Sequence, residues 1–353
     1  MTKTDDRPDR GSVKPVVAVF GAYGHTARFV TAELVKRGWT PVLSGRDAGK
    51  LAAAAADHPG VESRVASVDD PASLDRALAG AALVINCAGP FGETAPALVE
   101  AALRAGIHYL DVTGETLVAS STFDTYQDDA RVKEAGIVVA PVMAFYGALG
   151  DLLATVAIGD WPAADEISVA VALDSWHPTR GTLLAGERRA GRRVVHSDHQ
   201  LRVVAGDVPQ PRGTWTFPAP FGTQDVVGEF STTDVITISR HLDPERISTF
   251  LNTTPLKDLS GPETRAPQAV DADGRSAQVF LVEVVVRRGD EERRVAVHGR
   301  DIYAFTAPIV VEAAERILDG RGRATGVVTA GQIFDAEDFL RSLPLDGLSL
   351  GNA

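Results

Sequence analysis

The sequence is poor in sulfur and in aromatic residues: its 353 residues include one cysteine and two methionines, and aromatic residues make up 6%. A single cysteine, Cys87, excludes an intrachain disulfide and a thiolate metal site. No histidine pair has the spacing of helical metal ligands, so we predict no metal. A reducing compartment fits this composition, and we expect a cytoplasmic protein. The net charge of −12 argues against a nucleic-acid partner or an anionic membrane surface.

A long uninterrupted apolar run is also missing. Residues 137–159 come closest, with Asp151 as their one charged residue, but Pro141, Gly147 and Gly150 interrupt them. We therefore expect a short strand and a separate buried helix, and no membrane span. Residues 1–14 are polar and charged without an apolar core, which indicates a disordered leader and not a signal peptide.

Arginines gather at two places in the second half of the chain. One group brackets Gly289 and most simply surrounds a solvated turn. The other, at 188–193, is interpreted as a solvated face, with contact to a substrate as the alternative. The group at 188–193 consists of Arg188, Arg189, Arg192 and Arg193.

What the sequence does contain is a glycine turn directly after an apolar, β-branched run, Val16–Phe20. The turn reads Gly21, Ala22, Tyr23, Gly24, His25, Thr26 and Ala27. Gly21 permits a tight turn, Gly24 lets a phosphate approach the backbone, and Ala27 lets helix and strand pack closely. A pyrophosphate would then lie at the start of a helix. We predict a dinucleotide site formed by Gly21, Tyr23, Gly24, His25 and Thr26; a tight turn without a ligand is the alternative.

Strand-like and helix-like segments alternate through residues 15–152. The expected strands are Val16–Phe20, Pro41–Ser44, Ser63–Ser67, Leu83–Cys87, His108–Val112 and Ile137–Ala140. The expected helices are Thr26–Arg37, Asp47–Asp57, Ala72–Leu78, Thr94–Ala105 and Phe123–Glu134. This alternation predicts an α/β Rossmann domain with a doubly wound parallel sheet, whose ligands bind beyond the carboxyl ends of the strands.

Residues 153–302 predict a second, α+β domain with a mostly antiparallel sheet. The expected strands are Val169–Leu173, Arg193–His196, Val235–Ser239, Val279–Arg287 and Arg294–His298. We expect a helix at Thr182–Arg189, loops near 206–222 and 253–274, and a last long helix at Ala307–Leu318. Residues 303–353 are predicted to be a helical segment that packs back on the Rossmann domain.

The end of the second expected strand indicates which dinucleotide is bound. NAD-specific domains usually carry an acid here, but this chain has Ser44, Gly45 and Arg46. Arg46 could stack over adenine and pair with a 2′-phosphate. Asp47 is explained as a helix cap. We predict NADP(H) as the cofactor.

The fourth and fifth expected strands end in further cofactor candidates. Ala88 and Gly89 let the backbone lie near the nicotinamide ribose, Asn86 could offer its amide, and Cys87 is expected to be a packed residue. Together the candidates are Asn86, Cys87, Ala88, Gly89, Pro90 and Phe91. Asp111, near the end of the fifth expected strand, is a polar group at the mouth of the cleft.

The glycine turn, Ser44–Asp47, Asn86–Phe91 and His108–Asp111 together resemble the saccharopine dehydrogenase-like superfamily, and in particular the branch with trans-acting enoyl reductases of polyketide and lipid assembly. The resemblance implies a Rossmann NADP domain, an α/β substrate domain and hydride transfer to a C=C or C=N bond. The chain departs from the family at Tyr23, at Tyr146, where an acid is expected, and at Leu149, near an expected proline.

Hydride transfer requires a group that protonates or stabilises the atom that gains charge. The candidates, in falling order, are Tyr146, His177 and Asp111. The candidates for an apolar substrate wall with one cation are Met143, Phe145, Trp176, Arg180 and Tyr303.

Three hypotheses follow. The first is an NADPH-dependent reductase that acts on a C=C or C=N bond of a small molecule or carrier-bound intermediate. The second is an amino-acid dehydrogenase of the saccharopine type, and the third a non-catalytic NADPH-binding regulator. The sequence leaves open whether the chain forms a homodimer.

Overall fold

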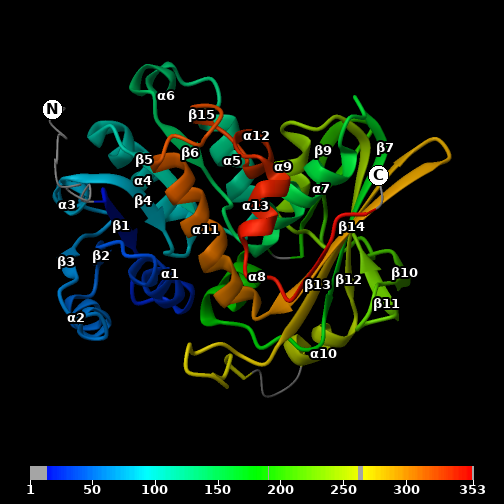
Figure 1. The fold of residues 1–353 in the computed structure, drawn as a ribbon, viewed down its shortest axis with the longest axis horizontal. Coiled ribbons are helices and arrows are strands. Elements are labelled where there is room, and N and C mark those ends of the chain that lie inside the picture. Colours follow the sequence, from blue (N-terminus) through cyan, green and yellow to red (C-terminus); the bar gives the residue numbers. More distant parts are fainter. Residues whose placement is uncertain (1–13, 190, 261–264, 352–353) are drawn as a thin grey trace, which may run out of the picture.

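The computed structural model describes residues 14–189, 191–260 and 265–351. The leader expected at 1–14 therefore lies outside the described residues except for Lys14. Two β-sheets form the frame of the molecule, and helix α11 (Ile302–Leu318) runs between them (Figure 1). One sheet is parallel and the other is mostly antiparallel, so the predicted fold class is confirmed.

The first sheet has seven parallel strands in the order β15-β6-β5-β4-β1-β2-β3. Its strands are β1 (Val16–Phe20), β2 (Pro41–Gly45), β3 (Glu62–Val65), β4 (Ala81–Asn86), β5 (His108–Asp111), β6 (Val138–Ala140) and β15 (Gly326–Val327). Strand β1 lies between β2 and β4, and its residues Val17, Ala18 and Val19 are completely buried. Burial on both faces explains the continuous apolar runs in these strands.

The helices of this half are α1 (His25–Lys36), α2 (Ala48–Ala56), α3 (Pro71–Leu78), α4 (Phe91–Ala105), α5 (Thr116–Tyr126) and α6 (Ala130–Ala135). Asp47 caps α2 as expected, since its side chain accepts a hydrogen bond from the Lys50 N–H at 3.0 Å. The single helix predicted at Phe123–Glu134 is wrong. One helix ends at Tyr126, and a new helix begins after Asp129, whose side chain caps it by accepting a hydrogen bond from the Arg131 N–H.

The second sheet has nine strands, seven of them in the order β10-β11-β12-β7-β13-β14-β16; β8 pairs with β12, and β9 pairs with β8. They are β7 (Ala164–Leu173), β8 (Arg193–Ser197), β9 (Gln200–Val204), β10 (Arg212–Thr216), β11 (Thr223–Gly228), β12 (Pro244–Asn252), β13 (Val279–Arg288), β14 (Glu291–Arg300) and β16 (Gly347–Ser349). Among the described strands of this second sheet, only the β7–β12 pair is parallel.

Three expectations for this half need correction. The segment predicted as the strand Val235–Ser239 is helix α9 (Asp234–Ser239), whose residues are buried on every side, so no polar alternation marks its period. The loop expected near 206–222 contains β10, and the loop expected near 253–274 contains α10 (Thr254–Ser260). The remaining helices are α7 (Gly150–Ile158), α8 (Arg180–Arg189), α12 (Ala330–Ile333) and α13 (Ala336–Ser342). The η1 segment (Phe145–Leu149) precedes α7 and is kinked, because Tyr146 and Gly147 have non-helical dihedral angles.

The end of the chain joins both halves. Helix α11 packs along α1, where Arg37 donates to Glu33, Glu312 and Glu315. Strand β15 then extends the first sheet, and β16 extends the second. A single hydrophobic cluster consequently includes residues of both sheets and of α11. Within the described residues, no helix is both long and apolar enough to cross a membrane.

Candidate active site

The glycine turn holds the start of α1 open to a ligand. Gly21 has φ +79°, and a Cβ there would lie 2.7 Å from the Ala88 Cβ, so no larger residue fits. The N–H groups of Gly21 and Ala22 donate to the Ser44 carbonyl at 2.8 and 3.1 Å. Gly24 offers no side-chain cap to α1. The first amides of this helix are therefore available to an anionic group such as a pyrophosphate.

Two cationic side chains, Arg46 and Lys50, lie shortly after the end of β2. Arg46 is exposed, whereas the Ser44 side chain is completely buried and contributes through its carbonyl. The Tyr23 ring lies against Gly45, where a Cβ would be 2.7 Å from Cε1. Lys50 Nζ lies 5.9 Å from the centre of the same ring. Sequence reasoning missed Lys50, a second cation near Arg46, because its partner ring belongs to a different loop.

The loop after β4 is shaped by its own side chains. Asn86 is buried, and its amide donates to the Thr94 hydroxyl at 3.0 Å and accepts from the Ala88 N–H at 3.0 Å. This amide therefore fixes the loop that carries Ala88 and Gly89, and is not turned towards a ligand. Burial raises the pKa of the Cys87 thiol, which keeps the thiol protonated and suits a packed residue.

Asp111 joins the ends of β5 and β6. Its fully buried carboxylate accepts from the Tyr109 hydroxyl at 2.8 Å, from the Thr113 N–H at 3.0 Å and from the Val142 N–H at 2.8 Å. Burial raises the pKa of Asp111. With these partners Asp111 is suited to position the strand ends, including Val142, whose φ of 66° is unusual for a β-branched residue.

The backbone around Tyr146 is held by α9. The Thr233 hydroxyl donates to the Tyr146 carbonyl at 2.8 Å, and the Gly147 N–H donates to Asp234 Oδ1 at 2.9 Å. Gly147 has φ +108°, and a Cβ there would lie 2.0 Å from a Val142 methyl. The chain can therefore pass through this point only with glycine, which fixes where Tyr146 lies beyond the end of β6.

The Tyr146 hydroxyl is buried and has no hydrogen-bond partner among the described residues. Burial, and then the nearby Tyr303 and Asp234, raise the pKa of this phenol well above its ordinary value. The group is therefore a protonated phenol at neutral pH. A buried hydroxyl without a partner is costly, which indicates that a ligand supplies one.

Tyr303 lies across from Tyr146, at the start of α11. Its hydroxyl accepts from Trp176 Nε1 at 3.0 Å and from the Thr179 N–H at 3.3 Å, and bonds with the Thr182 hydroxyl at 2.9 Å. Asp301, held at φ 56°, caps α11 by accepting from the Tyr303 N–H. Tyr303 thereby fastens the segment from Trp176 to Thr182 against the first domain.

His25 connects the glycine turn with Tyr303. The two rings meet edge to face with centroids 5.4 Å apart. Burial, followed by the Arg28 charge, lowers the pKa of His25, so the imidazole is neutral. Its buried Nε2, like the Tyr146 hydroxyl, has no partner among the described residues.

We call these facing rings the aromatic cluster; its members are His25, Tyr146, Trp176, Phe230 and Tyr303. The centroid of the Trp176 ring lies 6.3 Å from that of the Tyr146 ring and 6.1 Å from that of the Phe230 ring. Phe230 was missed from the sequence because nothing marks it in a loop between β11 and α9.

The other predicted residues lie around this cluster. Met143 and Phe145 are buried, and the Phe145 ring packs edge to face against the Tyr146 ring with centroids 4.9 Å apart. These two residues therefore belong to the core next to the aromatic cluster. Arg180 is exposed at the start of α8. His177 is half-buried and makes no hydrogen bond or ion pair within the described parts of the chain.

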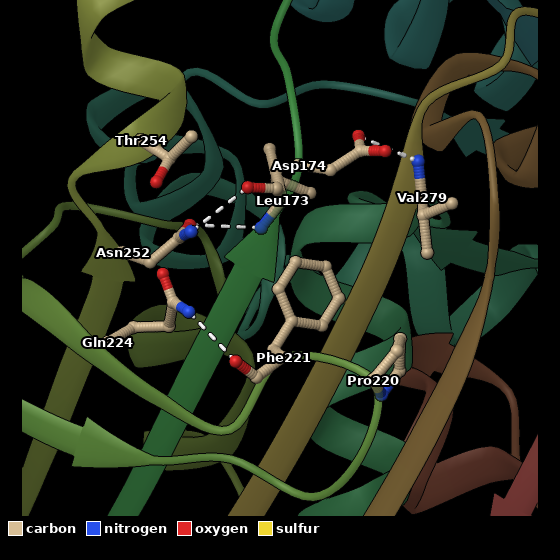
Figure 2. A pocket seen from close by; sticks show the side chains of 8 residues that line it. All are labelled: Leu173, Asp174, Pro220, Phe221, Gln224, Asn252, Thr254 and Val279. Carbon is tan, nitrogen blue, oxygen red and sulfur yellow. Dashed lines mark hydrogen bonds between the residues drawn. The ribbon is translucent and has the colours of Figure 1, made fainter.

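A cavity of about 440 Å³ opens beside the segment that carries Trp176 (Figure 2). The Asn252 amide closes one side by bonding both the N–H and the carbonyl of Leu173 at 2.9 Å. Gln224 donates to the Phe221 carbonyl on another side, and the Phe221 ring lies along the cavity. Asp174, which lines this cavity, lies two residues before Trp176 of the aromatic cluster.

Comparison with known proteins identifies the first half. Residues 17–139 match the family model described as the saccharopine dehydrogenase NADP binding domain. A saccharopine dehydrogenase-like oxidoreductase of Bos taurus is 29% identical over 140 residues, which are 35% of this chain and 33% of that protein. A trans-acting enoyl reductase of Mycobacterium bovis is 29% identical over 133 residues, 35% of this chain and 31% of that protein. The chain thus matches about a third of the length of these relatives.

The fold as a whole has a counterpart among solved structures. An apo saccharopine dehydrogenase (L-Glu forming) from Saccharomyces cerevisiae superposes with a TM-score of 0.64 at 13% identity, covering 95% of this chain and 100% of that one. At this identity the likeness concerns the fold alone. The predicted resemblance and the prediction of an NADP-binding domain are confirmed.

Proposed function

We propose, from the membership of residues 17–139 in the saccharopine dehydrogenase NADP-binding domain family, that this chain is an NADPH-dependent oxidoreductase that reduces a C=C or C=N bond. The observation that carries the proposal is the unpartnered, buried Tyr146 hydroxyl at the carboxyl end of the parallel sheet. Ligands of doubly wound sheets bind at this end.

The chain's own residues fit the cofactor. The first amides of α1 would hold the pyrophosphate, and the close approach of Gly21 to Ala88 requires that position 21 carry no side chain. Arg46, with Lys50 nearby, would hold a 2′-phosphate. When bound, NADPH supplies a hydride to an electrophilic carbon.

Tyr146 is the proposed proton donor. Its raised pKa keeps the proton on Oη until a neighbouring atom gains negative charge. The Trp176, Phe230 and Tyr303 rings would exclude water from this position, which strengthens the hydrogen bond from Oη. Asp111 acts as a positioning residue because its carboxylate is occupied by the ends of β5 and β6.

The test compares Tyr146→Phe with the unchanged chain. We expect kcat for NADPH oxidation to fall at least about 100-fold, because the donor proton is lost, while the Kd for NADPH stays within about twofold. The acceptors are a panel of α,β-unsaturated carbonyl compounds and cyclic imines. Tyr126→Phe is the matched control, since the Tyr126 hydroxyl bonds to Glu100 outside the aromatic cluster.

Other outcomes have definite meanings. Full kcat in Tyr146→Phe contradicts the assigned proton donor. Turnover restricted to imines formed between an amino acid and an oxo acid would indicate the saccharopine-type dehydrogenase. Tight NADPH binding without turnover of any acceptor would indicate the non-catalytic regulator instead of an enzyme.

A further inference from the structure

Helix α8 lies on the surface and reaches from one domain to the other. None of its residues from Arg180 to Arg189 is buried. Thr182, in its first turn, bonds with Tyr303, and Arg188, in its last turn, pairs with Glu93 of α4 at 3.3 Å. The helix therefore borders the aromatic cluster without belonging to either hydrophobic core.

Arg189, at the end of α8, forms no ion pair with any acid in the part of the chain that the structure describes. Its side chain is half-buried, and its buried Nε has no partner among the described residues. Burial and the Arg193 charge lower the pKa of Arg189, as expected for a cation that lacks a counter-charge.

Two arginines close to Arg189 in the sequence have acids of their own. Glu229 accepts from Nε and Nη2 of Arg193 at 3.1 and 2.8 Å, and Glu93 is paired with Arg188. An arginine that is partly removed from water and has no anion costs free energy unless a ligand pairs with it.

The position of this guanidinium links it to Tyr146. Arg189 Cζ lies 5.9 Å from the centre of the Phe230 ring. Phe230 packs on Trp176 at 6.1 Å, and Trp176 packs on Tyr146 at 6.3 Å. A row of two rings thus separates the cation from the proposed proton donor.

We propose that Arg189 binds a carboxylate of the substrate, held apart from the reducible bond by an apolar segment that lies on Phe230 and Trp176. This inference rests on the proposed function for the position of the reacting bond. A guanidinium forms two parallel hydrogen bonds to a carboxylate, and its planar face remains free to stack on Phe230. Arg188 and Arg193 are already paired with acids, and Arg192 is exposed and donates to the Arg189 carbonyl. Arg189 is therefore the partly buried guanidinium of this group that lacks an anion among the described residues.

The test measures binding of a probe acid and needs no turnover. The probes are 3-phenylpropanoate and its neutral analogue 3-phenylpropanamide, titrated calorimetrically into the full chain with NADP⁺ present. We expect the acid to bind at least about tenfold more tightly than the amide, and Arg189→Gln to abolish this difference. Arg189→Lys should restore part of it, because the charge returns without the two parallel bonds.

Arg188→Gln is the matched control, and should keep the acid–amide difference. The NADP⁺ affinity should be equal in all variants, which shows that the fold is intact. An acid that binds no better than the amide to the unchanged chain, or a difference that survives Arg189→Gln, would overturn the proposal. Arg189-dependent binding of phenyl phosphate more tightly than of the acid would overturn the choice of a carboxylate. Because the test measures binding without turnover, a finding that the chain is not a reductase would not by itself produce any of these results.

Discussion

At the scale of one residue, we expect Arg46 to decide which dinucleotide the first domain prefers. The side chain is exposed directly after β2, and the acid that would select NAD is missing there. We expect Arg46→Ala to weaken NADPH binding by about 10- to 100-fold, because a charge-assisted contact with the 2′-phosphate is lost. NADH binding should change by less than about threefold.

Both affinities are measured by titration of the cofactor's fluorescence. Arg76→Ala provides the control, since Arg76 is an exposed arginine of α3 whose partner is Asp70. Equal losses of NADPH and NADH affinity in Arg46→Ala would refute the assignment of this residue to the 2′-phosphate.

Single residues also mark the limit of sequence reasoning at the site. Gly21 and the Asp47 cap could be predicted because their roles depend on neighbours close in the chain. Asn86 and Asp111 were recognised as polar groups at strand ends, but the sequence does not reveal that Thr94, Tyr109 and Val142 occupy their hydrogen-bonding atoms.

At the scale of elements, the contact between α9 and η1 carries a titratable group. Asp234 Oδ1 accepts from the Gly147 N–H, its Oδ2 has no partner among the described residues, and burial raises the pKa of Asp234 from 3.8 to about 6. Between these two pH values the folded chain binds more protons than the unfolded chain. The free energy of unfolding therefore falls as pH rises through this window, by up to about 3 kcal/mol from this group.

Asp234→Asn should remove this contribution. We expect urea unfolding of the unchanged chain, followed from about pH 4 to about pH 7, to show a steeper decline than that of the variant. Parallel pH profiles of the two proteins would show that Asp234 does not titrate in this range.

The elements also differ in how well the sequence predicts them. Repeated strand and helix periods made the parallel sheet predictable to within a few residues at most boundaries. In the second sheet, the parallel β7–β12 pair joins segments far apart in the chain, and α9 is too thoroughly buried to show a helical period. Local patterns cannot reveal either feature.

For the whole molecule, the return of the chain through α11, β15 and β16 predicts cooperative unfolding. One hydrophobic cluster contains Val17 of the first sheet, Val284 of the second and Val310 of α11. We expect thermal unfolding to give coincident midpoints by tryptophan fluorescence and far-ultraviolet circular dichroism. Trp39 reports on the first half, and Trp161, Trp176 and Trp215 report on the second. Two separated transitions would show that the halves unfold independently.

The aromatic cluster is likewise a property of the whole molecule. Its rings come from the glycine turn, from the η1 segment, from two loops of the second domain and from α11. Tyr146, Trp176 and Tyr303 could be proposed from the sequence because each lies next to an expected element end. Phe230 and Arg189 could not be joined to them, because only the folded chain brings their segments together.

The edge-to-face contact of His25 with Tyr303 joins the two proposed ligand sites. His25 begins the helix that would receive the pyrophosphate, and Tyr303 secures the segment that would receive the substrate. If a dinucleotide orders the first ring and thereby the second, it raises substrate affinity by some factor. Reciprocity then requires that substrate raise dinucleotide affinity by the same factor, so each ligand would bind more tightly in the presence of the other.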